Sequence, residues 1–240
     1  MTFSELVHAR RSVRRFDEKY NFDHEAVTRA LELTVLSPNS SNMQTWEFYR
    51  IKSANKLEAM TKACMGQGAA RTASEMVVFV CRPDLWEKRA SWNLKQIMKN
   101  VKDPTNMSKL EKRGQYYYQT VMPLFYGSWP FGLKTLFRKG IALWYTLTGK
   151  PIMRWSTKDD IRVVCHKSLG IAAQTFMLSM KNEGYDTCPM EGFDEQWAAK
   201  IIDLPKGAEI CMIIGCGKGL PEGILSERVR LPMEEVVFEL

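Results

Sequence analysis

Two short stretches near the start of the chain combine residue types that bind an anion and a flat polar ring. The first, Arg10–Arg15, holds four arginines and one serine in six positions. Arginine presents a fork of N–H donors that matches the oxygens of a phosphate dianion. The second, Ser37–Trp46, is a run of small amides and hydroxyls closed by a tryptophan. Such side chains can satisfy the donors and acceptors on the edge of an isoalloxazine ring, so together the stretches indicate a flavin mononucleotide (FMN) site.

The elements that must position these stretches follow from caps and apolar periodicity. Thr2 and Glu5 have the spacing of a capping box, which predicts a helix running toward Arg10. Asp23 is the expected N-cap of a second helix, which Pro38 ends. Strands are predicted at 47–51, 76–81, 185–188 and 209–215, further helices at 55–65, 159–182 (capped by Asp159 or Asp160) and 194–202 (capped by Asp194), and a loop at 189–193. We therefore expect an α+β fold with three α/β/α layers, a mixed central sheet and helices on both faces.

The composition limits the class of protein. With 240 residues and 45% apolar content, the chain can bury one sizeable core, and we expect one domain over residues 1–240. No apolar stretch is long enough to span a bilayer, which predicts a cytoplasmic protein. The six cysteines are scattered and the three histidines show no ligand spacing, so the sequence indicates neither a disulfide framework nor a metal site.

The positive excess behind the net charge of +7 lies in residues 82–158. This basic segment carries 15 Lys and Arg against 4 Asp and Glu, and 13 of the chain's 26 Phe, Trp and Tyr. We interpret it as a helical insertion that forms either a lid over the flavin or an excursion at a dimer surface. Aromatic side chains in it could wall a pocket for a flat aromatic substrate; they are Tyr116, Tyr117, Tyr118, Phe125, Tyr126 and Trp129.

Residues 131–150 leave a further alternative open. Here apolar residues (Phe131, Leu133, Leu136, Phe137, Ile141 and Trp144) interleave with Lys134, Arg138 and Lys139, as in an amphipathic helix at a membrane surface. Weak membrane contact would bring a lipophilic acceptor such as a quinone within reach. Nucleic-acid binding suits the charge but has no motif, so we expect no nucleic-acid partner.

Four segments, in the same order along the chain, resemble the nitroreductase family of FMN-dependent reductases and their dehalogenase relatives. They are Arg10–Arg14, Ser37–Trp46, Cys188–Phe193, and Arg228–Pro232 followed by Glu234–Val237. In the second segment Thr45 stands where the family usually has proline. Each match alone is short, but their order, spacing and chemistry agree with one another.

The resemblance implies a homodimer with FMN at the subunit interface, and it implies roles for three sets of residues. The phosphate and ribityl end would be held by Arg10, Arg11, Ser12, Arg14, Arg228 and Arg230. The ring would be contacted, across the subunit interface, by Pro38, Asn39, Ser40, Asn42 and Gln44. The other face would be covered by Pro189, Met190, Glu191 and Gly192, with the backbone of Glu191 near flavin N5. Around Gln67 and Arg71 the resemblance is out of register by a residue or more, so neither residue is assigned a role.

The resemblance also implies the reaction. NAD(P)H would pass hydride to flavin N5 and leave, and an electron-poor acceptor such as a nitroaromatic or a quinone would then be reduced, in a ping-pong sequence without a catalytic side chain. Two alternatives stay open. One is reductive dehalogenation or other flavin chemistry on an aromatic ligand, and the other is a membrane-surface protein that uses the basic segment.

Overall fold

One four-stranded sheet forms the centre of the protein. The structure is a computed structural model that describes residues 1–127, 133–154 and 157–240. The strands are β1 (Trp46–Ile51), β2 (Glu75–Cys81), β3 (Asp186–Met190) and β4 (Glu209–Gly217), in the spatial order β1-β2-β4-β3. Each predicted strand is present, and the α+β class is confirmed.

The sheet differs from the expectation in its strand directions. We expected a mixed sheet, but all three pairs of neighbouring strands are antiparallel. Within the described residues, parallel pairing occurs as one isolated bridge between Ser12 and Thr187. The uninterrupted apolar run of β2 is typical of a strand buried on both faces, which is common in parallel sheets. Here the same run arises because helices cover both faces of an antiparallel sheet.

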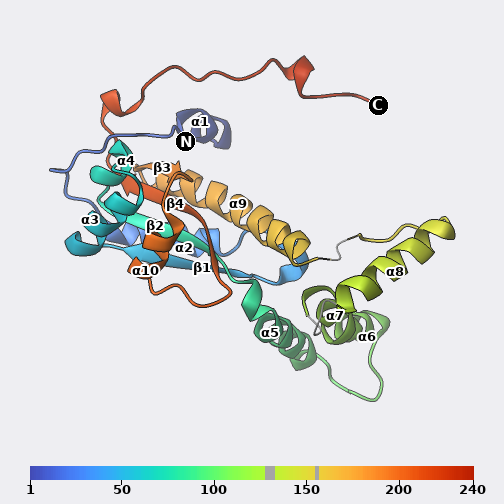
Figure 1. The fold of residues 1–240 in the computed structure, drawn as a ribbon. Coiled ribbons are helices and arrows are strands. Elements are labelled where there is room, and N and C mark those ends of the chain that lie inside the picture. Colours follow the sequence, from blue (N-terminus) through green and yellow to red (C-terminus); the bar gives the residue numbers. More distant parts are fainter. Residues whose placement is uncertain (128–132, 155–156) are drawn as a thin grey trace.

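Two layers of helices cover the sheet (Figure 1). The side chains of β2 alternate between the faces, as the twofold period of a strand requires: Val77 and Phe79 point to one core, and Val78 and Val80 to the other. The first core is closed by α2 (His24–Thr34) and α9 (Lys158–Asn182), and the second by α3 (Ala54–Ala63), α4 (Gly68–Arg71) and α10 (Glu195–Ile201). The three-layer arrangement is therefore confirmed.

Local caps set most element ends. Helix α1 (Phe3–Ala9) begins after Thr2 with both hydrogen bonds of the predicted capping box. Helix α9 begins after Thr157 rather than after Asp159 or Asp160, because Thr157 and Asp160 form a capping box of their own. Strand β3 continues through Pro189, which we expected in a loop; proline is tolerated there because β3 is the edge strand next to β4.

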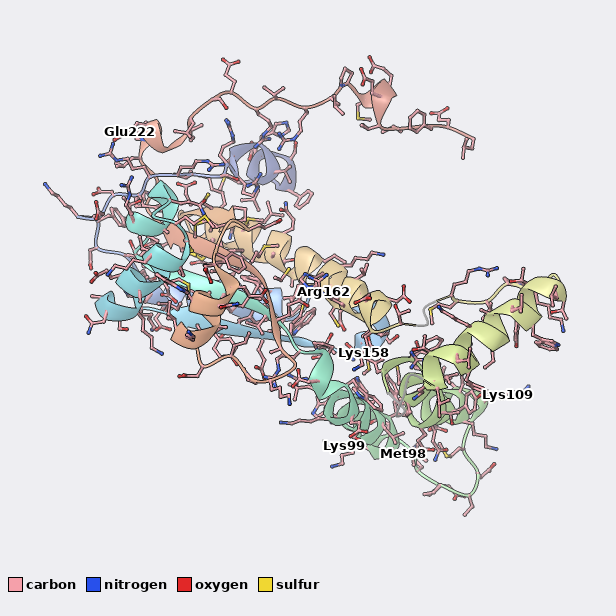
Figure 2. The ribbon with its side chains drawn as sticks, in the orientation of Figure 1. Met98, Lys99, Lys109, Lys158, Arg162 and Glu222 are labelled. Carbon is pink, nitrogen blue, oxygen red and sulfur yellow. The ribbon has the colours of Figure 1, made fainter. Side chains whose placement is uncertain are left out.

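Residues of the basic segment form helices at one end of the three layers (Figure 1). They are α5 (Trp86–Lys99), α6 (Lys109–Tyr116), α7 (Met122–Tyr126) and α8 (Leu133–Leu147), with a 3-10 turn at Pro83–Leu85 and a π-helical turn at Tyr117–Val121. Figure 2 labels Lys109 at the start of α6 and Lys158 at the start of α9. Trp129 and Phe131, for which we expected pocket and membrane roles, lie outside the described residues. None of the helices in the described part of the chain combines the length and apolar character needed to cross a bilayer.

Helix α8 turns two of its three cations inward, contrary to the expectation for a membrane-surface helix. Lys134 and Arg138 are buried and donate to the backbone carbonyls of Pro123 and Gly127 at the end of α7. The Pro123 carbonyl also accepts from the amide of Gly127, and cationic side chains commonly bond carbonyls in the last turn of a helix. Burial lowers the pKa of both groups. The exposed large apolar side chains of α8 are Leu133, Leu136, Phe137, Leu143, Trp144 and Leu147.

Candidate functional site

A cavity of about 310 Å³ lies between the arginine-rich segment, Arg10–Arg15, and the chain that follows the 3-10 turn η5 (Pro221–Gly223). We call it the arginine cavity. All six residues predicted for the phosphate end line it: Arg10, Arg11, Ser12, Arg14, Arg228 and Arg230. The two groups come from opposite ends of the sequence. In Figure 1 the C-terminal segment passes over α1, and Figure 2 labels Glu222 where that segment leaves the core.

Hydrogen bonds to backbone hold the two chain ends together. The Nη2 of Arg228 donates to the carbonyls of Arg10 (2.6 Å) and His8 (3.1 Å), and Nη2 of Arg11 donates to the carbonyl of Ser226 (2.6 Å). The amide of Arg14 donates to Gly223 at 2.8 Å. Position 223 has no room for a side chain, because a Cβ there would lie 2.6 Å from the carbonyl oxygen of Arg15. The close approach of the two segments therefore depends on a glycine.

The charges in this cavity are unbalanced. Five of the six residues are arginines, and Glu227 is the one carboxylate among the residues that line the cavity. Within residues 1–127, 133–154 and 157–240, no ion pair joins any of these five guanidiniums to a carboxylate. Burial, together with the nearby guanidiniums of Arg228, Arg230 and Arg11, lowers the pKa of Arg10. A bound dianion would relieve this repulsion, so the donor set fits a phosphate group.

The predicted 189–192 segment lies beside the arginine-rich segment. The amide of Val13 donates to the carbonyl of Thr187 at 3.0 Å, so residues 12–13 run along the edge strand β3. Pro189 and Met190 end β3, and Glu191 and Gly192 follow as exposed residues. The structure thus brings two of the three predicted sets of residues to the same edge of the sheet.

Gln67 joins this segment, although we gave it no role. Its Nε2 donates to the carbonyls of Gly192 (2.6 Å) and Cys64 (3.1 Å). The amide therefore fixes the loop that follows β3. The family resemblance did suggest an amide or a basic side chain near the flavin in this part of the chain. It did not distinguish Gln67 from Arg71 as that residue.

The predicted ring-binding residues lie elsewhere, against α9. Within the described residues, none of Pro38, Asn39, Ser40, Asn42 and Gln44 lines the arginine cavity. The hydroxyl of Ser37 donates to Thr175 of α9 (2.9 Å), and the amide of Ser40 donates to Ser168 (3.3 Å). We call residues 37–44 the ring loop; it contains the 3-10 turn η1 (Ser40–Asn42).

The ring loop is held in a conformation that L-residues rarely adopt. The φ angles of Ser41, Asn42 and Gln44 are 56°, 50° and 47°. Such left-handed residues persist where surrounding contacts fix them. One such contact is internal, since Oδ1 of Asn39 accepts from the amide of Gln44 at 2.8 Å.

Further contacts come from the basic segment. The Nδ2 of Asn42 donates to Oδ1 of Asn93 (2.8 Å), while Nδ2 of Asn93 donates to the carbonyl of Asn42 (2.7 Å). Ser41 bonds both tyrosines of the π-helical turn: its hydroxyl lies 2.7 Å from the Tyr117 hydroxyl, and its carbonyl accepts from Tyr118 (2.9 Å). We call Asn93, Tyr117 and Tyr118 the clamp. It was missed from the sequence because its partners lie some 50 to 77 positions away.

Comparisons with known proteins agree on the fold. The nitroreductase family model matches residues 7–218. MhqN of Bacillus subtilis, a candidate NAD(P)H nitroreductase, is 25% identical over 235 residues, which cover 98% of this chain and 97% of MhqN. Among solved structures, the candidate nitroreductase YdfN of B. subtilis superposes with a TM-score of 0.75 at 20% identity, covering 99% of this chain and 98% of its own.

A second solved structure carries a ligand. It is a candidate nitroreductase of Exiguobacterium sibiricum in complex with FMN, with a TM-score of 0.70, 20% identity, and coverage of 100% of this chain and 98% of its own. The matched region, residues 7–218, includes Arg10–Arg15, the whole ring loop and all four strands. The chain therefore belongs to the nitroreductase family.

Proposed function

We propose that this protein passes hydride equivalents from NAD(P)H, through bound FMN, to an electron-poor acceptor such as a nitroaromatic or a quinone in a ping-pong sequence. As a nitroreductase-family member it is an FMN-dependent NAD(P)H oxidoreductase. When bound, FMN would supply the redox chemistry by taking up and releasing hydride. The single observation that carries the proposal is the arginine cavity, which has the size, charge and donors for the FMN phosphate.

The chain's own residues would bind and orient the cofactor. Arg10, Arg11, Ser12, Arg14, Arg228 and Arg230 would hold its phosphate and ribityl end. Residues 189–192 would cover one face of the ring, with the backbone of Glu191 turned toward N5. Gln67 would act as a positioning residue, since it fixes the carbonyl of Gly192. Cations around the cavity would also stabilise negative charge on the reduced cofactor.

We also propose that each site is shared by two copies of the chain. The phosphate set and residues 189–192 lie at one edge of the sheet, whereas the ring loop packs on α9 and stays outside the cavity. A second copy could bring its ring loop to the cavity and complete the site. Exposed apolar side chains on the C-terminal segment, such as Val229 and Phe238, would become buried at the subunit interface of such a dimer.

A visible spectrum tests the proposed function directly. The purified protein should be yellow or should turn yellow with added FMN. Under anaerobic conditions NADPH or NADH should bleach it, and a nitroaromatic or a quinone should restore the colour. A colourless protein that takes up no FMN would contradict the proposal. Colour that returns with a halophenol, with halide released, would instead favour reductive dehalogenation.

The clamp gives the basic segment a specific role in this function, because it holds the left-handed part of the ring loop. Replacing the buried Asn93 with alanine should remove two hydrogen bonds, lower the free energy of unfolding by about 1 to 3 kcal/mol and weaken FMN binding. Urea unfolding and FMN titration measure the two effects. Asn100→Ala, at the exposed end of the same helix, is the matched control. A loss of stability with unchanged FMN affinity would show that the clamp does not serve the site.

Helix α8 favours a second candidate function, contact with an anionic membrane surface. Its outward face is apolar, and it lies in a segment with an excess of 11 positive charges, of which Lys139 and Lys150 are exposed beside that face. Lys134 and Arg138 would take no part, because they bond the end of α7. A lipophilic acceptor could then be reached from the bilayer.

Co-sedimentation with anionic vesicles checks this contact. The double variant Leu143→Ser/Trp144→Ser should lose most of its vesicle binding, because both exposed side chains would insert between lipids. The matched control Leu33→Ser/Leu36→Ser removes two exposed leucines at the end of α2 and should bind as the parent protein does. Equal binding by both variants would contradict membrane contact, and a change of oligomeric state without loss of binding would assign the α8 face to a second copy.

A further inference from the structure

Three thiols, an imidazole and a carboxylate gather on the α9 side of the sheet, away from the arginine cavity. Cys81 ends β2, Cys211 and Glu209 lie on β4, and Cys165 and His166 lie in the first three turns of α9. Cys81 and Cys165 are 1% exposed, whereas Cys211 is half-buried. None of these groups has a role in the proposed flavin chemistry.

A β-bulge aims Cys211 into this cluster. The register between β2 and β4 changes from Val80 opposite Ile210 to Phe79 opposite Met212, which leaves Cys211 as the extra residue. Cys211 and Met212 consequently both pack against the core on the α9 side. Without the bulge, consecutive strand residues would point to opposite faces. The thiol of Cys211 therefore faces the same core as Cys81 of the neighbouring strand β2 and Cys165 of α9.

The charges around Cys211 favour its thiolate. The groups that face it are Cys81 from β2, His166 from α9 and Glu191 from the end of β3. Interactions with the Cys81 thiol and then with His166 lower the pKa of Cys211 against the opposing effects of burial and Glu191. The same interactions raise the pKa of Cys81 and of His166, which favours the thiol form of Cys81 and the protonated form of His166.

Neighbouring side chains hold the imidazole in place. Nε2 of His166 lies 3.5 Å from Oε2 of Glu209, and Glu209 accepts from Nε of Arg162 at 2.6 Å. Figure 2 labels Arg162 in this part of α9. Glu209 thus lies at ion-pair distance from the ring and favours its protonated form. An accessible thiolate beside an imidazolium and a second thiol is the arrangement of a redox-reactive cysteine.

We propose that Cys211 is a peroxide-reactive thiolate and that Cys81 is its resolving thiol. The Cys211 sulfur attacks hydrogen peroxide: an S–O bond forms, the O–O bond breaks, and the departing hydroxide takes the His166 proton to give water. The Cys81 sulfur then attacks the sulfenic sulfur: an S–S bond forms, the S–O bond breaks, and the second water leaves with the Cys81 proton. The two thiols lose two electrons, and the peroxide gains them.

Peptide mapping of the complete wild-type protein tests the first step. With limiting iodoacetamide at pH 6, Cys211 should be alkylated before the other five cysteines, and its rate should fall only as the pH drops through its lowered pKa. An ordinary thiol would slow below about pH 8.5. His166→Gln should slow the reaction at pH 6 by about tenfold or more, whereas the exposed His8→Gln should not. Cys211 labelling no faster than that of the buried cysteines would overturn the proposal.

Oxidation tests the second step. One equivalent of hydrogen peroxide should yield a peptide pair cross-linked through Cys81 and Cys211 in the wild type. In Cys81→Ser, the sulfenic acid on Cys211 should persist and be trapped by dimedone, while the control Cys188→Ser should cross-link as the wild type does. Equal trapping in the wild type and in Cys81→Ser would overturn the role of Cys81. If Cys81→Ser does not fold, the wild-type cross-link decides alone. No measurement in this series depends on bound FMN.

Discussion

Arg14→Ala should weaken FMN binding by about 10- to 100-fold, because a charge-assisted hydrogen bond to the phosphate is lost. Arg14 lines the arginine cavity, and its backbone is fixed by the hydrogen bond to Gly223. The variant should purify with little colour and regain it at high FMN concentration. Titration followed by flavin fluorescence measures the dissociation constant.

Arg15→Ala is the matched control for this change. Arg15 is the next residue, carries the same charge and is exposed like Arg14, but it does not line the arginine cavity. Its removal should leave FMN affinity nearly unchanged, since an exposed distant charge is screened by salt. If both variants lose affinity equally, the cluster acts through its general field and not through a phosphate contact at Arg14.

Features that depend on neighbouring residues could be predicted from the sequence. The capping box of Thr2 with Glu5 and the cap at Asp194 follow from short spacings, and both helices begin where expected. The strand directions could not be predicted, because a fully apolar run such as β2 is compatible with a parallel or an antiparallel sheet. Pro189 was assigned to a loop since its edge position in the sheet was not visible from the sequence.

The candidate site also has parts that the local sequence predicts and parts that depend on contacts between distant residues. The arginine-rich segment is visible as a local cluster, but its joining with Arg228 came from family resemblance and not from spacing. The roles of Gln67 and Asn93 depend on single side-chain bonds between distant segments. The direction in which the Cys211 side chain points depends on a bulge in β4, which no local pattern indicated. Contacts of this kind are set by tertiary packing, and a single sequence does not encode them in a short motif.

The largest effect on stability is expected at Glu75, which is completely buried at the start of β2. Its Oε1 accepts from Nε of Arg50 at 2.6 Å, and its Oε2 lies 2.6 Å from Nδ1 of His24. The bond to Glu75 raises the pKa of Arg50, which also donates to Thr28. Glu75→Gln removes the buried negative charge and leaves Arg50 without its counter-ion. The free energy of unfolding should fall by about 3 to 5 kcal/mol, as measured by urea denaturation.

Two comparisons separate the loss of a buried charge from the loss of a hydrogen bond. Glu58→Gln breaks an exposed pair with Lys62 and should change stability little, because such pairs are screened by solvent. The double variant Arg50→Met/Glu75→Met removes both charges of this pair, the half-buried Arg50 and the buried Glu75, and fills similar volumes, so it should recover most of the stability that Glu75→Gln loses. Recovery would mean that the pair fixes how α2 sits on the sheet and adds little net stability. A double variant as unstable as Glu75→Gln would instead show that the ion pair itself stabilises the core.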